Sequence, residues 1–292
     1  MRTSLLAWEG RKYLRWALLL GVVSILLFGS QVGGGAQPPN GGTWQGYVLG
    51  TIGALLIVWL SMLGVRKRRY ASTLGTVQGW TSAHVYLGSI LLLVATLHCA
   101  AQFGWNVHTL AYVLMCVVIV SGFYGLYAYM HLPSRVAENN GGRAREVWLA
   151  ELADLDTAIH DLAEGSDAEL QGITISALDM TRLGGSTWQQ LSARDYSLVQ
   201  LPGGGRPVAN PEQAVVIDHL SRRIPKAQKT SEAELLNELL ALFGRRQVIL
   251  HRLRRDVRLQ GLLKVWLLLH IPLTVALMVA LLIHIISVFI YW

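Results

Sequence analysis

Charged side chains are scarce in this sequence: only 15% of its 292 residues are Asp, Glu, Lys or Arg, whereas 52% are hydrophobic. A water-soluble domain usually carries about 25% charged residues, so the composition favours a membrane protein. Cysteine is scarce too, with only Cys99 and Cys116, and there is no C-x-x-C-H motif. Covalent attachment of a c-type haem, a Cys-ligated iron–sulfur cluster and a structural zinc site are therefore excluded.

Long apolar runs are what the sequence contains instead. Five such runs lie at residues 14–30, 45–64, 81–101, 109–130 and 263–291. Each is about as long as a helix needs to cross ~30 Å of hydrocarbon at about 1.5 Å per residue. The first run resembles a signal peptide, but a poor processing site follows it, so we interpret it as a retained anchor helix. The sequence predicts an all-α integral membrane protein with a five-helix transmembrane bundle.

A hydrophilic segment separates the fourth run from the fifth. We expect transmembrane helices 1–4 in residues 1–134, a mostly helical insert in residues 135–262, and the fifth transmembrane helix in residues 263–292. The insert is expected to serve as a cytoplasmic docking or scaffold domain.

Several elements are predicted within the insert. Apolar residues at helical spacing predict helices at 145–163 and 211–223, and short strands are expected at 170–180 and 196–201. Ser231 followed by Glu234 is a capping signature. The helix that begins there is expected to continue without a break into the fifth span.

The distribution of lysine and arginine predicts the membrane topology. Of the 25 such residues, four lie before or at the start of the first run (Arg2, Arg11, Lys12 and Arg15), four lie between the second and third runs, and seventeen lie from Arg135 to Lys264. The segments 31–44 and 102–108 contain none. By the positive-inside rule, the N-terminus and the 131–262 segment are expected in the cytoplasm, and the C-terminus outside an inner, cytoplasmic membrane. The net charge of +7 then reflects topology and anionic lipid, with no sign of nucleic-acid binding.

Four histidines lie in the apolar runs as two equally spaced pairs. Residues 84–98 read HVYLGSILLLVATLH and residues 270–284 read HIPLTVALMVALLIH. Fourteen residues of helix advance about 21 Å and rotate to within about 40° of four full turns, so both histidines of a run share one face. Because the third and fifth runs cross in the same direction, His84 should lie level with His270, and His98 level with His284.

Two histidines that face each other across a helix pair are the axial ligands of a low-spin b-type haem. Two such levels predict two haem b groups stacked across the bilayer, with irons about 20 Å apart. A lone intramembrane histidine more often bonds a neighbouring helix, but intramembrane ionisable residues are costly and tend to be functional. Zinc or proton transport would favour carboxylates in the spans, and the five runs contain none.

Other residues are weaker candidates for contacts with the two predicted haems. Propionates of the cytoplasmic-side haem would find cations among Arg66, Lys67, Arg68, Arg69 and Lys264, although the positive-inside pattern explains most of them. On the outer side the candidates are Gln45, Gln102, Asn106, Trp44 and Trp105. His108 and His131, at the ends of the fourth run, are expected at the interface, with His131 the better candidate for a quinone or propionate contact. Small residues that admit a bulky ring, or simply close helix packing, are Gly46, Gly50, Gly53, Gly88, Gly122 and Gly125.

The paired histidines on the third and fifth helices resemble those of the ferric reductase/NADPH oxidase transmembrane domain. The two-level ligation is also similar to cytochrome b of the quinol–cytochrome c oxidoreductases. The resemblance covers residues 81–130 and 263–291, and it implies that His84, His98, His270 and His284 are haem ligands. The sequence departs from these families: it has no sixth span, no flavin or nicotinamide domain, and no membrane-embedded quinol-oxidation motif.

The expected function is transmembrane electron transfer by a di-haem b-type cytochrome. With no flavin or iron–sulfur site of its own, the protein should be one subunit of an oxidoreductase rather than a self-contained catalyst. Its expected partners are the lipid bilayer, quinone, a c-type cytochrome outside, or an iron–sulfur or flavoprotein subunit on the cytoplasmic side. The alternative is a non-redox membrane scaffold or transporter whose histidines only pack helices.

Overall fold

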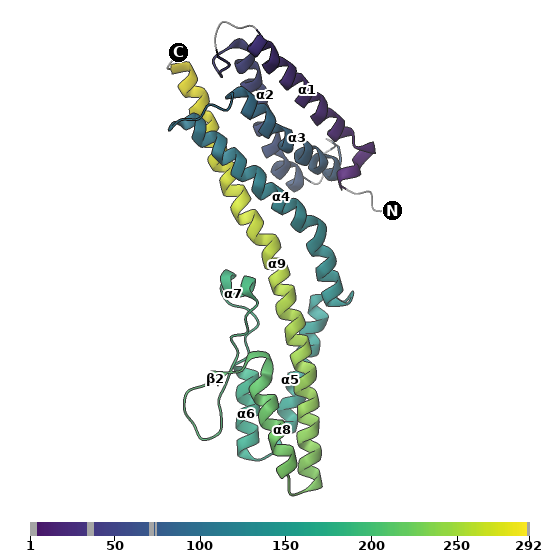
Figure 1. Cartoon of the computed structure of the whole chain (residues 1–292). Coiled ribbons are helices and arrows are strands. Elements are labelled where there is room, and N and C mark those ends of the chain that lie inside the picture. Colours follow the sequence, from purple (N-terminus) through teal and green to yellow (C-terminus); the bar gives the residue numbers. More distant parts are fainter. Residues whose placement is uncertain (1–4, 34–37, 70–72, 74, 291–292) are drawn as a thin grey trace. The chain divides into compact units, whose positions relative to one another are not determined.

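The computed structural model describes residues 5–33, 38–69, 73 and 75–290, and these are almost entirely helical (Figure 1). The α-helices are α1 (Lys12–Gly33), α2 (Trp44–Arg68), α3 (Val77–His98), α4 (Val107–Asn140), α5 (Arg145–Glu164), α6 (Ala168–Asp179), α7 (Thr187–Ser192), α8 (Ala214–Arg223) and α9 (Thr230–Ile290). Short 3-10 helices lie at Leu5–Gly10, Pro211–Gln213 and Ile224–Lys226. Strands β1 (Leu198–Val199) and β2 (Val208–Ala209) form one antiparallel pair. The prediction of an all-α protein is confirmed.

Five helices among the described residues are long and apolar enough to cross a membrane, namely α1, α2, α3, α4 and α9. They contain the five apolar runs of the sequence, so the prediction of five such helices is also confirmed. Large apolar side chains are exposed along all five. A hydrocarbon solvent suits such surfaces, and a helix satisfies its own backbone hydrogen bonds there.

The chain divides into two compact units. Residues 1–127 and 266–292 form the membrane-helix unit, and residues 128–265 form the insert unit. These compact units divide at 127/128 and 265/266, whereas the expected boundaries lie at 134/135 and 262/263. Both α4 and α9 contribute residues to each unit, so the chain passes between the units within helices.

In the membrane-helix unit, α3 packs against both α1 and α2 (Figure 1). The α1–α3 contact is close, because a Cβ atom on Gly21 would come within 2.9 Å of Ile90 Cδ1. A buried apolar cluster joins the other helices, and it includes Leu60 of α2, Leu91 of α3, Met115 of α4 and Leu277 of α9. In the sequence, Leu91 lies midway between His84 and His98, and Leu277 lies midway between His270 and His284.

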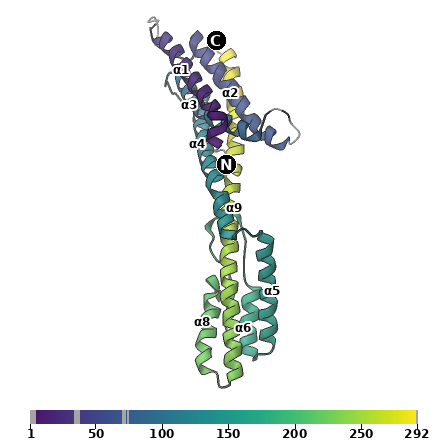
Figure 2. The ribbon, with the colours of Figure 1, turned by 90° about the vertical axis from the view of Figure 1, so that its right-hand side faces the viewer.

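In the insert unit, α5, α6 and α8 pack around the N-terminal part of α9 (Figure 2). The buried core contains Ile159 of α5, Ile173 of α6, Leu220 of α8, and Leu239 and Phe243 of α9. The predicted helix at 145–163 is confirmed as α5. The predicted helix at 211–223 is present as a 3-10 turn followed by α8.

The prediction of a strand at 170–180 is wrong, because this segment forms α6. Asp167 caps the helix by accepting a hydrogen bond from the Leu170 N–H at 2.9 Å. Leu170, Ile173 and Ala177 are buried at helical spacing. Burial of this face outweighs the strand preference of the β-branched residues in the segment. The strand expected at 196–201 is present only as the two residues of β1.

The last prediction for the insert is confirmed: α9 is one helix of 61 residues that continues into the fifth apolar run. Its first residue, Thr230, precedes the predicted capping serine by one position.

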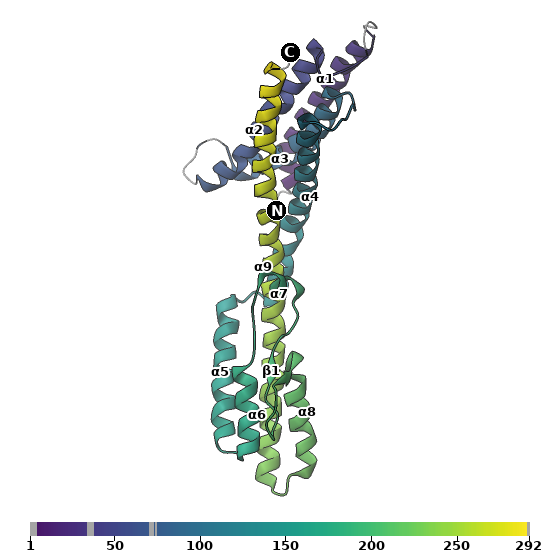
Figure 3. The same ribbon diagram turned by 90° about the vertical axis from the view of Figure 1, so that its left-hand side faces the viewer.

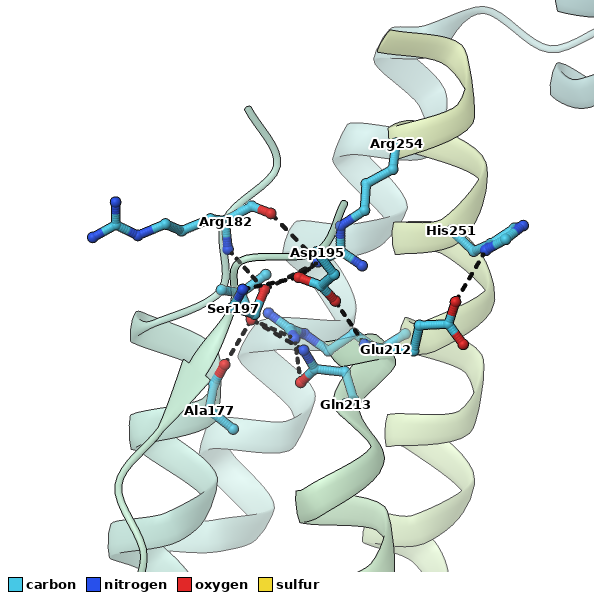
Figure 4. Close-up of polar contacts among 10 residues, drawn as sticks. Ala177, Arg182, Asp195, Ser197, Glu212, Gln213, His251 and Arg254 are labelled. Atoms are coloured by element: carbon cyan, nitrogen blue, oxygen red, sulfur yellow. Dashed lines mark hydrogen bonds and ion pairs between the residues drawn. The ribbon is translucent and has the colours of Figure 1, made fainter. Parts of the chain in front are cut away.

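Polar side chains hold the 180–213 segment against α9. Asp195 accepts hydrogen bonds from the backbone N–H groups of Ser197 and Glu212, at 2.9 and 2.6 Å (Figure 4). It also pairs with Arg254 of α9 at 2.8 Å, and both side chains are largely buried. Arg254 donates in addition to Ser197 Oγ and to the Arg182 carbonyl oxygen. Buried charges of this kind are stable only when paired and hydrogen-bonded.

A second buried cation, Arg246, precedes Arg254 on α9. Arg246 is 1% exposed and donates to Asp156 at 2.7 Å, to Gln213 Oε1 at 2.9 Å and to Thr181 Oγ1 at 3.0 Å. Arg246 of α9 therefore bonds to α5, to the segment just after α6 and to the 3-10 turn before α8.

Replacing Arg246 with methionine should destabilise the insert unit, because the change leaves Asp156 and Gln213 without their buried partner. We expect a loss of about 3 kcal/mol, or about 100-fold in the hydrogen-exchange protection of α5 amides. The neighbouring Arg245→Met is the control, because Arg245 pairs with Glu151 at an exposed position. Its effect should stay below about 1 kcal/mol. Equal effects of the two changes would contradict the structural role of Arg246.

A pH dependence follows from the N-cap of α6. Burial alone would raise the pKa of Asp167, but the Leu170 N–H and the Arg223 guanidinium outweigh it and hold that pKa below the usual 3.8. The stabilisation is therefore present above the ordinary pKa of an aspartate and is lost as pH falls through the folded-state pKa. Asp167→Asn keeps a capping side chain but removes the charge. It should lower the melting temperature slightly at pH 7 and not at strongly acidic pH, whereas Asp218→Asn, in the exposed pair with Arg222, should change neither.

Candidate histidine pairs in the membrane-helix unit

The first pair joins α3 to α9. The ring centroids of His84 and His270 lie 6.5 Å apart, with an interplanar angle of 63°. His84 Nδ1 lies 3.1 Å from the Leu60 carbonyl oxygen of α2, and His270 Nδ1 lies 2.7 Å from Ser121 Oγ of α4. Because a carbonyl oxygen only accepts, His84 carries its proton on Nδ1 and keeps a lone pair on Nε2.

The second pair lies at the other end of the same two helices. His98 and His284 have ring centroids 6.1 Å apart, with an interplanar angle of 86°. His98 Nδ1 donates to the Gly46 carbonyl oxygen of α2 at 2.8 Å, which again leaves Nε2 with its lone pair. His284 Nδ1 forms a hydrogen bond with His108 Nδ1 of α4. When His284 is the donor in that bond, its Nε2 is free as well.

The structure thus brings the four intramembrane histidines together in the two combinations expected from topology. All four belong to the membrane-helix unit. Each has its Nδ1 bonded to a neighbouring helix, and the four partners are two backbone carbonyls, a serine and a histidine. An Nδ1 bond that fixes the ring and leaves Nε2 available is the usual arrangement of a metal-binding histidine.

The separation within each pair fits a shared metal ion. A metal about 2 Å from one nitrogen of each imidazole would hold the two ring centroids about 6 Å apart. Among the residues that the structure describes, no group of three or more His, Cys, Asp or Glu side chains is arranged to hold a metal. Each pair could supply two protein ligands, the number that an iron with four porphyrin nitrogens would need.

Glycines of α2 and α4 allow the histidine rings to lie close to the helices. A Cβ atom on Gly50 would come within 2.7 Å of His98 Cε1 and 2.9 Å of Nδ1. On α4, a Cβ atom on Gly122 would lie 3.6 Å from His270 Cε1, an ordinary contact distance, so the fit is less tight there. Gly53, by contrast, faces only Leu91 and Val94 at ordinary contact distances. Of the glycines singled out in the sequence, Gly50 is thus the one that the His98 ring needs.

Trp266 lies one turn before His270 on α9, with the two rings 5.5 Å apart. Its indole covers Gly125, where a Cβ atom would overlap the ring. The buried Nε1 of Trp266 has no hydrogen-bond partner. Burying an N–H group without a hydrogen-bond partner costs free energy. This position therefore fits a bound group that offers a hydrogen-bond acceptor to the Trp266 N–H.

The candidate propionate contacts are placed differently from one another. Arg66 is buried and donates to the carbonyl oxygens of Arg69 and Gly75, so its guanidinium joins the end of α2 to Gly75. Arg68 and Arg69 are exposed at the same end of α2. Lys264 is exposed on α9 and belongs to the insert unit. The sequence pattern alone did not separate Arg66 from its neighbours.

The outer-side polar candidates serve mainly local structure. Gln102 donates to the Pro39 carbonyl oxygen, and Asn106 accepts from the Thr109 N–H at the start of α4. Trp44 and Trp105 are exposed. None of these contacts reaches the histidine pairs.

The sequence did not predict two residues of α4 that bond to the paired histidines. His108 was assigned to the interface alone, yet it contacts His284, and its place at the outer end of the fourth run was the signal that could have indicated this. Ser121 bonds His270 and carried no signal, because serine is common in membrane helices. His131, the other histidine of α4, is exposed in the insert unit.

The apolar surfaces and the paired imidazoles describe a membrane protein with two candidate metal-binding levels. Compared with known proteins, the chain matches no family model, no curated protein and no solved structure.

Proposed function

We propose that this protein is a di-haem b-type cytochrome that transfers electrons across a membrane as one subunit of a larger redox complex. The observation that carries the proposal is the pairing of His84 with His270 and of His98 with His284, each Nδ1 being held by a neighbouring helix. The proposal extends to an inner, cytoplasmic membrane, with the insert unit on the cytoplasmic side, on the strength of the lysine and arginine distribution.

The residues present fit a haem at each level. Two neutral imidazoles, an apolar surrounding and small residues beside the rings are what bis-histidine ligation requires. Gly50 makes room at the His98 level, and the buried Trp266 N–H at the His270 level has no other acceptor. Haem iron, when bound, would supply reversible one-electron chemistry.

The chain's own contribution is ligation, orientation and spacing. The Leu60 and Gly46 carbonyls fix the tautomer and direction of His84 and His98, and such bonds also make an imidazole a stronger ligand. Fourteen residues of α3 and of α9 set the levels about 21 Å apart along the helices. The apolar cluster between them, with Leu91 and Leu277, keeps water away from the intervening space.

A haem pair of this kind exchanges electrons with other redox groups. We propose quinone, a c-type cytochrome on the outer side, or an iron–sulfur or flavoprotein subunit on the cytoplasmic side as the exchanging partners. Outer segments without any lysine, arginine, aspartate or glutamate suit a covered surface.

The second candidate is a non-redox scaffold or transporter in which the histidines only join helices. It is favoured by the fact that every one of the four imidazoles has a hydrogen-bond partner on another helix, as packing histidines do. The two candidates differ in whether the protein binds haem.

The test is the reduced-minus-oxidised absorption spectrum of the full-length protein purified from membranes, combined with the haem content. The proposal predicts a low-spin b-type spectrum and about two haems per chain. A protein that is purified folded but shows no b-type signal would support the scaffold alternative. A content of one haem per chain would overturn the two-level arrangement.

A further inference from the structure

A short helix lies against α9 directly before its membrane part. A Cβ atom on Gly261 of α9 would come 3.4 Å from Leu191 Cδ2 of α7, so the two helices touch there (Figure 3). Gly261 precedes Leu263, the first residue of the fifth apolar run, by two positions. At about 1.5 Å per residue, α7 therefore lies within about 3 Å of the start of the span, measured along α9.

The side chain of Trp188, in α7, projects from the protein surface. Its side chain is 78% exposed, although tryptophan is one of the residues that gain most from leaving water. The helix around it is well fixed: Ser186 Oγ accepts from the Gln189 N–H, and Gln189 Oε1 accepts from the Ser186 N–H. A rigidly presented indole at this level has the properties of the aromatic residues that anchor proteins at a membrane surface.

The charges around α7 complement an anionic surface. Residues 180–194 contain no aspartate or glutamate, but they include Arg182 and Arg194, both exposed. Figure 4 shows the Arg182 guanidinium directed away from the Asp195 network. On α9 no carboxylate follows Asp256, whereas Lys264 is exposed.

We propose that α7 is a membrane-interface anchor, in which the Trp188 indole inserts between lipid headgroups and Arg182, Arg194 and Lys264 contact anionic lipid phosphates. The anchor would attach the 180–213 segment to the same bilayer that α9 enters. Each basic residue near an anionic surface contributes favourably, and the aromatic ring adds apolar burial. This proposal does not depend on haem binding.

Tryptophan fluorescence of the full-length protein in lipid vesicles tests the proposal. The vesicles contain phosphatidylcholine and phosphatidylglycerol, with or without bromine on the acyl chains near the headgroup. The difference between wild type and Trp188→Phe isolates the Trp188 emission. It should be blue-shifted relative to a water-exposed indole and should lose most of its intensity in brominated vesicles.

Trp148→Phe is the matched control, because Trp148 is buried within the insert unit and bonded to the Asn140 carbonyl. The emission that this difference isolates should not respond to bromine. An unquenched, water-like Trp188 signal would overturn the proposal and assign the exposed indole to solvent or to a protein partner.

The charge component is tested by the double variant Arg182→Gln/Arg194→Gln. In wild type, quenching of Trp188 should be weaker in vesicles of pure phosphatidylcholine than in those with phosphatidylglycerol. The double variant should lose this difference. Quenching that is the same in both lipids for wild type would refute the anionic-lipid contact.

Discussion

Each single change His84→Ala and His270→Ala should reduce the haem content from two to one per chain, and both should remove the same haem. The reason is that the two imidazoles lie 6.5 Å apart and are proposed to share one iron. A haem with one histidine left loses its low-spin bis-imidazole state and is held weakly. The changes His98→Ala and His284→Ala should remove the other haem.

The measurement is haem content together with the spectrum and midpoint potential of the haem that remains. His84→Ala and His270→Ala should leave an identical remaining spectrum, and the outer pair should leave a different one. His160→Ala is the control, because His160 is a half-buried residue of α5 in the insert unit, and the variant should retain both haems. Different remaining haems in His84→Ala and His270→Ala would refute the pairing.

Gly50→Ala should selectively remove the haem at the His98 level. The added methyl would come within 2.7 Å of His98 Cε1, so the ring must move. Moving it breaks the 2.8 Å bond from Nδ1 to the Gly46 carbonyl, which orients the ring. Most of the outer-side haem should be lost, with the His84 level unchanged.

The matched control is Gly53→Ala on the same helix, one turn further on. Its methyl would lie 3.8 Å from Leu91 Cδ1, an ordinary packing distance. Both changes gain about 1 kcal/mol in helix propensity, so a difference between them isolates the contact with His98. Equal haem contents in the two variants would contradict a tight fit between Gly50 and His98.

The long apolar helices could be predicted from the sequence because length and composition alone decide them. The secondary structure of the insert was harder to predict, because its short segments mix residues that favour helices with residues that favour strands. At 170–180 the β-branched Ile173, Thr174 and Ile175 suggested a strand, but burial at positions 170, 173 and 177 selects a helix. Such burial depends on partners in α5, α8 and α9 that lie far away in the sequence.

The histidine pairs could be predicted because two quantities, helix rise and crossing direction, determine which residues are level. The contacts that orient these histidines could not be predicted from the sequence. Leu60 and Gly46 act through backbone carbonyls, which every residue has, so no residue type indicates them. Ser121 and His108 depend on the rotation of α4 about its axis, and an apolar run leaves that rotation undetermined. Arg66 and Arg68 are the same residue type on one helix, and only the structure shows that Arg66 is buried and bonded to the Gly75 carbonyl.

The continuity of α9 has a mechanical consequence. An α-helix resists torsion, and no loop interrupts α9 between Arg246 in the insert unit and His270 and His284 among the membrane helices. Pro272, two positions after His270, donates no backbone hydrogen bond, so α9 resists torsion least beside His270 and is not uniformly stiff as far as His284.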